Sequence, residues 1–554
     1  MATPGSSFVD PEKKQAGIYD VHPVNSNSNV VGETNELGVQ GTERGLKARH
    51  AQMIAIGGTI GTGLFVGSGQ ALSMGGPLIV LLAYCIISCL VYGIVTATTE
   101  MSSYLPVRGA NMSYYGTRFF SRSLGFAMGW MYWYVFSITV PAEVTATSLV
   151  IQYWEPPVHV AVWITLTIIV ILALNCFPVK VYGEAEFWFA SIKVFGIIGL
   201  ILMALVLVCG GGPSGEAYGF RYWHNPGPTK EYPVDGVGGD IGRLRAFVAV
   251  ITFSVFAFAF APELLVVTGG EMQNPRRNLP IAGRTYFYRL IFFYVFGIFF
   301  IGLIVSSNNE SLLNGESGAG SSPWAVAARE AGIKGLDSVI NAVIVISAWS
   351  AGNAYLYLAS RTLYSMALVG NAPKIFTRCT KSGIPYYALG ASASWSLLAY
   401  LNVADSGATV FNWFINLINT GGYQSWICVC IIYLRFRKAT FAQGITDLPF
   451  RSRFQPYLAY LCMVVFTLLM LLSGYKVFLP GYWKAASFLT AYIGIPIFLI
   501  LYFGHRFTIG KNDAWCHSIE EMDLVSGLAE IIAQEEPRKQ RDEKWYIKWR
   551  TALT

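Results

Sequence analysis

A run of seven residues rich in glycine could bind a small charged solute through its backbone. The run consists of Gly57, Gly58, Thr59, Ile60, Gly61, Thr62 and Gly63. Each glycine disfavours an α-helix by about 1 kcal/mol relative to alanine. Where a helix unwinds, the free N–H groups of the next half-helix can hold a carboxylate, and the free C=O groups before it can hold an ammonium. The run therefore predicts a site for a zwitterion, and the structural alternative is a small-residue face for helix packing.

A second interruption is expected about two hundred residues later, where a proline and a glutamate follow an apolar stretch. The stretch reads Phe258, Ala259, Phe260, Ala261, Pro262, Glu263. Proline lacks a backbone N–H and clashes with the preceding turn of a helix, so a break is expected here. We expect the residues from Phe258 to Ala261 to line the same binding site, with the two phenylalanines as gates. The alternative for Pro262 alone is a structural kink.

Three ionisable residues within apolar sequence are candidates for moving a proton: Glu143, Lys193 and Glu263. Charged side chains inside a membrane are costly, and they usually serve a function. Lys193 lies nine residues after the expected start of its helix at Glu184, which is about 14 Å along the helix axis. A lysine buried there can release and take up a proton. The alternative is a lysine permanently bound to backbone carbonyls.

The two acids also have structural alternatives. Glu143 could meet an amino group of the solute, could relay a proton, or could simply be hydrogen-bonded within the bundle. Glu263 could cap the half-helix that follows the break. Glu184 and Glu186 are explained by a helix start, where the helix dipole stabilises carboxylates. The six histidines fall in tails, loops or span ends, which leaves carboxylates and Lys193 for a proton route.

These residues must be positioned by membrane helices. The chain has 554 residues, of which 54% are hydrophobic and 13% are charged, whereas about one quarter of a soluble domain is charged. A membrane helix needs about 20 mostly apolar residues. Twelve such spans are expected, starting near Gln52, Leu78, Leu124, Val160, Glu184, Leu244, Thr285, Asp337, Pro385, Ala408, Tyr457 and Ala485.

The distribution of arginine and lysine predicts the orientation. Basic residues gather in the connections that follow spans two, six, eight and ten, and cytoplasmic loops carry such an excess. Both termini are therefore expected in the cytoplasm. The predicted organisation is a disordered tail at 1–50, a twelve-helix transporter domain at 51–507, and a tail at 508–554 with an amphipathic helix over 518–535. That helix could pack on the membrane domain or dock cytoplasmic trafficking regulators.

Several function classes are excluded by the absence of their motifs. The cysteines lie mostly inside apolar runs, and Cys428 and Cys430 point to different faces of a helix, so no metal site is expected. No nucleophile–base set, phosphate loop or dense basic patch occurs, which argues against an enzyme, a cofactor and a nucleic-acid partner. An ion channel would need a filter loop or a ring of charges, and none is evident.

Five longer motifs resemble those of the fungal amino acid permeases of the amino acid–polyamine–organocation superfamily. They occupy residues 41–50 (running on into the glycine run), 106–110, 183–188, 270–280 and 359–364. The resemblance covers about residues 41 to 505. It implies an all-α membrane protein with a LeuT-like 5+5 inverted repeat, discontinuous helices one and six, and two extra C-terminal helices.

The same resemblance implies proton-coupled symport of amino acids, neutral or of broad range, into the cell across the plasma membrane. It places Lys193 beside the unwound part of span one, Glu143 at the substrate cavity, and Glu263 on the inner pathway. The family usually has Gly-Thr-Glu or Gly-Ser-Glu at the break in span six, where this chain has Ala261, Pro262 and Glu263. Polyamine, choline-like or carnitine-like cations therefore stay open as substrates, and the long tails also permit a nutrient receptor.

Overall fold

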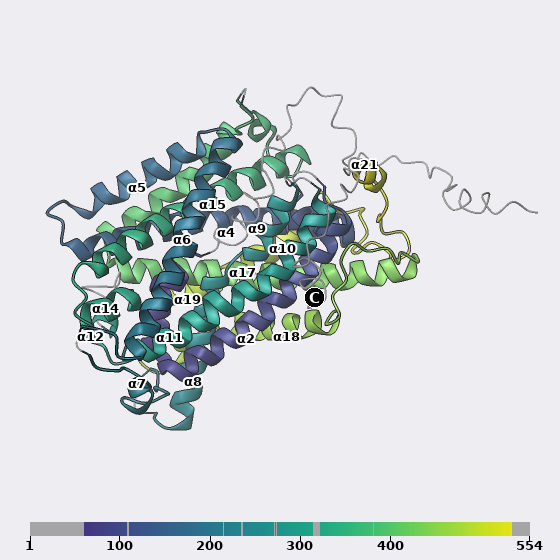
Figure 1. Cartoon of the computed structure of the whole chain (residues 1–554). Coiled ribbons are helices and arrows are strands. Elements are labelled where there is room, and N and C mark those ends of the chain that lie inside the picture. The colour runs from purple at the N-terminus through teal and green to yellow at the C-terminus, as the bar shows by residue number, and fades with distance from the viewer. Residues whose placement is uncertain are drawn as a thin grey trace, which may run out of the picture. The chain divides into compact units, whose positions relative to one another are not determined.

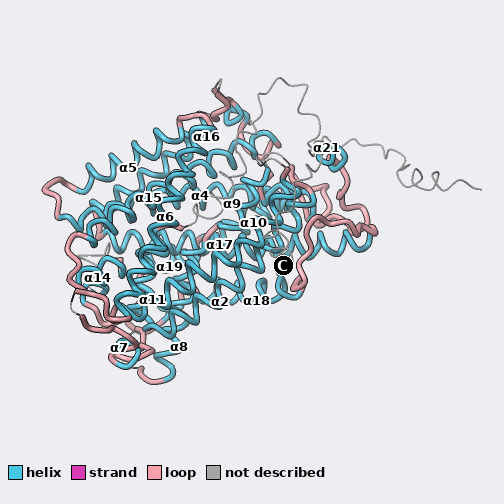
Figure 2. The backbone as a smooth tube through the Cα atoms, in the orientation of Figure 1, coloured by secondary structure: helices cyan, strands magenta, loops and turns pink. Residues whose placement is uncertain are grey.

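The computed structural model describes residues 60–107, 110–213, 215–233, 237–270, 272, 274–313, 322–380 and 382–533, without the side chains of residues 179, 180, 268 and 270. All of them lie within one compact unit, Gln40–Thr554. This part of the chain folds into helices joined by turns and loops, with no strand (Figure 2). The predicted all-α class is confirmed.

The long helices run through the bundle, and shorter ones cover its two ends (Figure 1). The α-helices are α2 (Ser68–Tyr104), α3 (Met112–Phe119), α4 (Arg122–Ile151), α5 (Val160–Asn175), α6 (Val179–Val208), α7 (Arg221–His224), α8 (Asp240–Ser254), α9 (Ala261–Gly270), α10 (Pro275–Arg289), α11 (Gly297–Ile304), α12 (Glu310–Leu313), α14 (Pro323–Glu330), α15 (Leu336–Leu368), α16 (Tyr386–Ala393), α17 (Gly407–Ala442), α18 (Tyr457–Leu472), α19 (Ala485–Tyr492), α20 (Gly494–Phe507) and α21 (Leu528–Ala533).

Tighter and wider helical turns extend several of these helices. The π-helical segments are η2 (Gly63–Gly67) and η5 (Leu290–Phe296), and the 3-10 segments are η3 (Gln152–Trp154), η4 (Val255–Phe258), η6 (Lys374–Thr377), η7 (Ser394–Val403) and η8 (Tyr475–Phe478). Such segments often mark functional or strained places in a helix. Here η2 and η4 adjoin the two expected breaks.

Seven helices among the described residues are long and apolar enough to cross a membrane, or eight if the bent pair α19 and α20 forms one span. Two further apolar helices, α5 and α18, have 16 residues each. The first of the seven, Gly63–Tyr104, contains Gly76 with φ 77° and ψ 171°, which is not helical. It therefore joins the second half of span one to span two, whose start was expected at Leu78. The count of twelve spans is not confirmed by this measure.

Two helices begin earlier than the sequence analysis predicted. Span five starts at Val179 rather than near Glu184, because Pro178 stands directly before the helix with ψ 151°. Span seven starts at Pro275 rather than near Thr285, because a proline is well suited to the first turn of a helix. Both shifts move charged residues from an expected loop or helix start into the body of a helix.

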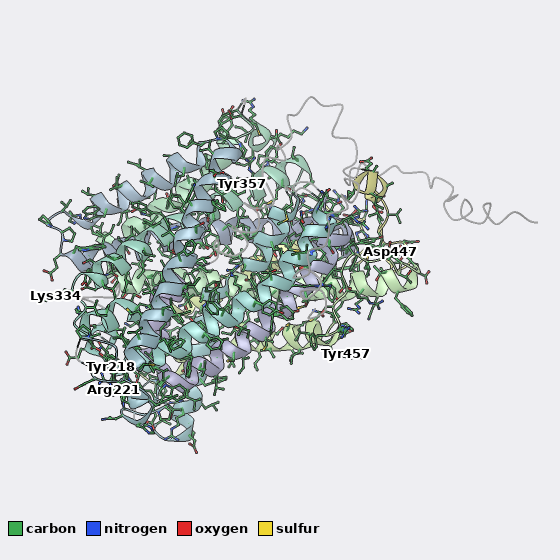
Figure 3. All side chains as sticks on the ribbon, viewed as in Figure 1. Tyr218, Arg221, Lys334, Tyr357, Asp447 and Tyr457 are labelled. Carbon is green, nitrogen blue, oxygen red and sulfur yellow. The ribbon has the colours of Figure 1, made fainter. Side chains whose placement is uncertain are left out.

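The two ends of the bundle are distinct. The α7 end carries Tyr218, Arg221 and Lys334, and Asp447 lies at the opposite end near α21 (Figure 3). We call the end near α21 the α21 end.

Side-chain caps fix the starts of some helices. At the start of α4, for example, the Ser121 hydroxyl accepts a hydrogen bond from the Leu124 N–H at 3.3 Å.

Burial separates the central helices from the outer ones. In the most apolar stretch of α4, and likewise of the α8–α9 segment, 89% of residues are buried, whereas α6 has 33%. Outward side chains of α6 such as Phe195 and Trp188 are mostly exposed, as lipid contact requires. Because α4 packs on α15 and α17, these central helices position the site.

The predicted amphipathic helix over 518–535 is not seen in that form. Thr508–Gly527 runs without regular helix, and α21 begins only at Leu528. The reason is tertiary: the Gln443 side chain donates to the carbonyls of Ile519, Glu520 and Met522 at 3.3, 3.2 and 2.8 Å, which takes acceptors that a helix would use. We call residues 508–527 the C-terminal strap.

Candidate functional site

The predicted break in span six is confirmed. Helix α8 continues into η4, which ends at Phe258, and α9 starts at Ala261. Between them Ala259 is extended (φ −55°, ψ 133°) and Phe260 has φ 55°. Pro262 therefore stands in the first turn of the second half-helix, where a missing N–H does no harm. The chain changes direction before the proline rather than at it.

The break in span one is described on one side only. Gly57, Gly58 and Thr59 lie outside the described residues, and so does the preceding half of the span. Ile60 is not helical, and the second half begins within Gly61–Gly63. The Ile60 carbonyl accepts from the Ser347 hydroxyl of α15 at 3.0 Å. A neighbouring helix thus satisfies a backbone group that the span itself does not.

The two breaks lie directly against each other. A methyl group added at Gly63 would lie 2.7 Å from Cα of Ala257 in η4, closer than real contacts allow. One added at Gly61 would lie 3.2 Å from a carboxyl oxygen of Glu143. Glycine is therefore needed at both positions. Because these residues have no side chain, span one can lie directly against η4 of span six and against the carboxyl group of Glu143.

Glu143 lies at the start of the second half of span one. It projects from α4, is buried, and accepts from the Thr62 hydroxyl at 3.0 Å. The Thr62 backbone N–H also interacts with this carboxyl. A carboxylate at a helix N-terminus is stabilised by the free N–H groups and by the helix dipole. Glu143 thus caps the half-helix at the position where the sequence predicts a solute carboxylate.

Lys193 lies near the middle of the 30-residue α6 and is fully buried. Its charge interacts most strongly with Glu186 and less strongly with Glu143. Glu186 is also fully buried and accepts from the Ser350 hydroxyl of α15 at 2.7 Å. Because buried charges need partners, these side chains tie α4, α6 and α15 together behind the break in span one.

Glu263 lies in the first turn of α9 and is buried. One of its oxygens accepts from the Ser425 hydroxyl of α17 at 2.6 Å. The Ser425 hydroxyl also pairs with the Tyr132 hydroxyl of α4 at 2.6 Å. This acid therefore connects the second half of span six to two central helices, α17 and α4.

Aromatic rings enclose the break in span six. Phe258 stacks on Tyr294 with centroids 4.5 Å apart, and Phe260 meets the edge of Phe136 at 5.2 Å. The Tyr355 hydroxyl of α15 donates to the Ala259 carbonyl at 3.2 Å. Both predicted gate residues, Phe258 and Phe260, are therefore buried and fixed in this conformation.

Several residues of this cluster were not singled out from the sequence. Glu186 was assigned to a helix start, but α6 begins seven residues before it. Ser350, Ser425 and Tyr355 carry no motif, and only their contacts across the bundle reveal them. The one available signal was Glu186 itself, an acid followed directly by an apolar run.

The amino acid permease family model matches residues 50–518. The chain is 45% identical to the proline-specific permease of Emericella nidulans over 516 residues, covering 91% of this chain and 93% of that protein. It is 45% identical to the proline-specific permease of Saccharomyces cerevisiae, covering 88% and 79%. It is 41% identical to the dicarboxylic amino acid permease of the same yeast, covering 83% and 76%.

A solved structure supports the fold. A crystal structure of a manganese transporter mutant of Eremococcus coleocola superimposes with a TM-score of 0.51 at 12% identity, covering 83% of this chain and 94% of that one. At this identity only the fold is comparable. With the family match over most of its length, the chain belongs to the amino acid permease family, and it is a membrane transporter of amino acids rather than an enzyme.

Proposed function

We propose that this permease imports proline together with protons across the plasma membrane. The observation that carries the proposal is the 45% identity, over about nine tenths of the chain, to permeases described as proline-specific. The geometry of the two breaks supports it, because they offer separate places for the carboxylate and the amine of a zwitterion.

The amine of proline is proposed to bind backbone carbonyls at the breaks. The Ile60 carbonyl accepts one hydrogen bond from the Ser347 hydroxyl, and the Ala259 carbonyl accepts one from the Tyr355 hydroxyl. A carbonyl oxygen has two lone pairs, so each retains an acceptor. The secondary ammonium of proline has two N–H donors, which such a pair of acceptors can satisfy.

Proton coupling is proposed to arise from competition between two carboxylates. Glu143 occupies the N-terminus of the half-helix through Thr62. An ionised Glu143 accepts hydrogen bonds from the groups at this helix N-terminus. A protonated Glu143 is no longer an anion, so it does not compete with the solute carboxylate for them. Binding of a proton to Glu143 would therefore free the helix N-terminus for the solute carboxylate. Each proline would then enter with one proton.

Lys193 is proposed to balance the charge of this exchange. It interacts with both Glu143 and Glu186, so it can stabilise whichever carboxylate is ionised. The structural alternative is a fixed anchor between α6 and its neighbours. Glu263 is proposed to act later, on the inner pathway, because it lies in the half of span six that follows the break, where it accepts from Ser425 of α17.

The orientation is also a proposal. The α21 end holds arginines of the connections after spans two and ten, including Arg118, Arg122 and Arg435, and the strap contacts them. Basic connections face the cytoplasm in membrane proteins. We therefore assign both tails, 1–50 and 508–554, to the cytoplasmic side of a twelve-span domain at 51–507.

The energetics suit symport. One charge moving across 100 mV yields about 2.3 kcal/mol, and one pH unit adds about 1.4 kcal/mol. Their sum of about 3.7 kcal/mol corresponds to roughly 500-fold accumulation of a zwitterion that enters with one proton.

The test is uptake of labelled proline in cells that lack their own permeases, at acidic and neutral external pH, with competition by the other amino acids and by polyamines and carnitine. Stronger uptake at acidic pH and competition by proline analogues are expected. Lys193→Ala should abolish most uptake at normal surface expression, and Lys484→Ala, an exposed lysine directly before α19, is the matched control. Uptake by Lys193→Ala equal to wild type would exclude the role of Lys193. Binding without uptake would indicate a receptor instead.

A further inference from the structure

A cavity of about 430 Å³ opens at the α7 end and is separate from the buried residues described above. Its lining includes Gln70, Asn412, Lys230, Lys476 and Tyr482. At its deep end it reaches Val66, about one helical turn beyond Gly63. The volume lies within the range of about 300–1,000 Å³ that is typical of small-molecule sites. We call it the outer cavity.

Lys230 is held at this cavity by its backbone. The Lys230 N–H donates to the Gly75 carbonyl at 2.9 Å, and the Leu78 N–H donates to the Pro228 carbonyl at 2.9 Å. These bonds fasten the loop to the non-helical turn at Gly76. The Lys230 ammonium then donates to the Ser307 carbonyl at 3.2 Å. Since an ammonium has three donors, two stay available, and burial lowers the pKa of this lysine.

Lys476 is placed at the same cavity by two tyrosines. Its ammonium donates to the Tyr232 hydroxyl at 2.9 Å and lies 4.7 and 4.9 Å from the ring centres of Tyr232 and Tyr482. Rings of this kind attract a cation at their faces. They orient the ammonium without neutralising it, so two of its donors also stay available.

The charge of the outer cavity is therefore unbalanced among the described residues. Neither lysine lies within ion-pair distance of a described carboxylate. Glu231 shares the lining, but its carboxylate accepts from the Gly239 N–H at 2.7 Å. Among the described lining residues, two ammonium groups stand against one carboxylate, and such an excess of positive charge attracts an anionic group.

The deep end of the outer cavity is closed. The Gln70 amide donates to the Asn412 side-chain carbonyl at 3.1 Å, which joins span one to α17. Phe411 meets Phe256 of η4 edge-on, with centroids 5.9 Å apart. The side chains of Gln70, Asn412 and Phe411 would therefore separate a solute in the cavity from the two breaks.

We propose that the outer cavity is a docking site for the free carboxylate of the solute, which Lys230 and Lys476 hold before the layer of Gln70 and Asn412 opens. The inference rests on the proposed function, because it takes an amino acid as the solute. The two lysines raise the local concentration of that solute at the entrance and take no part in the coupling by Glu143.

The first test compares uptake kinetics of Lys230→Gln, Lys476→Gln and the double variant with Lys334→Gln. Lys334 is exposed at the same end but does not line the cavity, so it controls for general surface charge. Each cavity variant should raise KM about three- to tenfold, because loss of a nearby charge weakens electrostatic capture, with the maximal rate unchanged. Lys230→Arg should restore most of the affinity. An unchanged KM in the double variant would overturn the proposal.

The second test detects docking without transport. Ser73 lines the cavity. The exposed cysteines of the described residues are Cys89, Cys176 and Cys209, so Ser73→Cys is placed in a background in which these three are alanine, and it should react with a membrane-impermeant thiol reagent. Proline should slow this reaction, and it should do so also in Lys193→Ala, the variant that we expect to lose transport. Prolinamide, which lacks the carboxylate, should not slow it, and neither should proline in the double lysine variant. Equal protection by proline and prolinamide would overturn docking through the carboxylate.

The two tests also separate this inference from the proposed function. If wild-type cells take up no proline but carboxylate-dependent protection persists, the proposed transport fails and the docking site stands. If uptake is normal and protection is absent, only the docking site fails.

Discussion

The break in span one is made from glycine and threonine, whereas the break in span six is made from phenylalanine, alanine and proline. At Gly63 even a methyl group would meet the backbone of Ala257 at 2.7 Å. At Phe260 the backbone adopts φ 55°, a conformation that is uncommon for bulky residues. The first break is therefore specified by exclusion of side chains, and the second by side-chain packing that holds an unfavourable backbone.

The partners of the two breaks differ in the same way. The first is met by the acid Glu143 and the hydroxyl of Ser347. The second is enclosed by the rings of Phe136 and Tyr294, with Tyr355 as the polar contact. We infer that the first break handles the charge of the solute carboxylate and of the coupled proton, whereas the second mainly selects shape. The predictions below test this division.

The largest effect is expected at the contact between the breaks. Gly63→Ala should abolish uptake, because the new methyl would force apart two backbones, and overpacking of this kind costs about 1–3 kcal/mol. Gly67→Ala is the matched control in the same π-helical segment, since its methyl would meet only Phe253 at 3.6 Å. Uptake is measured at equal surface expression. Similar activity of both variants would show that the close approach is not required.

Removing the charge at the first break should have the next largest effect. Glu143→Gln should lower the accumulation of proline at least about tenfold, because a neutral amide cannot take up the proton whose entry supplies about 3.7 kcal/mol. The residual uptake should no longer depend on external pH. Glu263→Gln, at the second break, should keep its pH dependence. If the two variants behaved alike, the division between charge and shape would not hold.

A change of shape at the second break should have a smaller effect. Phe260→Leu keeps an apolar side chain but loses the edge contact with Phe136, and such contacts contribute about 0.5–1.5 kcal/mol. We expect KM for proline to rise about two- to tenfold, with the pH dependence of uptake intact. Phe292→Leu, on an exposed outer position, should leave KM unchanged. Loss of pH dependence in Phe260→Leu would place proton coupling at this break as well.

The smallest effect is expected far from both breaks, in the C-terminal strap. Asp523 forms an ion pair with Arg118 at 3.1 Å. Partial burial alone would raise its pKa, but hydrogen bonds from Ser526 and the charge of Arg118 outweigh burial and lower the pKa. A lowered pKa means that the stabilisation is present at neutral pH and is lost only as the pH falls through the folded value.

Asp523→Asn should therefore reduce the stability of the detergent-purified protein by less than about 1 kcal/mol at neutral pH, since partly exposed ion pairs contribute little. KM for proline should not change. Thermal unfolding of this variant and of Asp240→Asn, whose side chain is almost fully exposed, gives the comparison. A large loss of uptake would mean that the strap is part of the transport cycle.

Some of the molecule could be predicted from local sequence alone. Helices begin at Val160, Tyr457 and Ala485 as expected, because hydropathy and flanking polar residues define a membrane helix locally. The break in span six was expected from one proline beside an apolar run, and it lies two residues before that proline. The family was evident from motifs that are continuous in sequence.

Other features depended on the tertiary structure. Thr62 and Glu143 are 81 residues apart, and no local pattern shows that one caps the other. Glu186 was assigned to a helix start, yet the fold buries it beside Ser350. A helix was expected over 518–535, which includes the second half of the strap, but Gln443 binds the carbonyls of Ile519, Glu520 and Met522. Hydropathy and propensity act over a few neighbouring residues, whereas the partner of a buried polar group is chosen by the packing of whole helices.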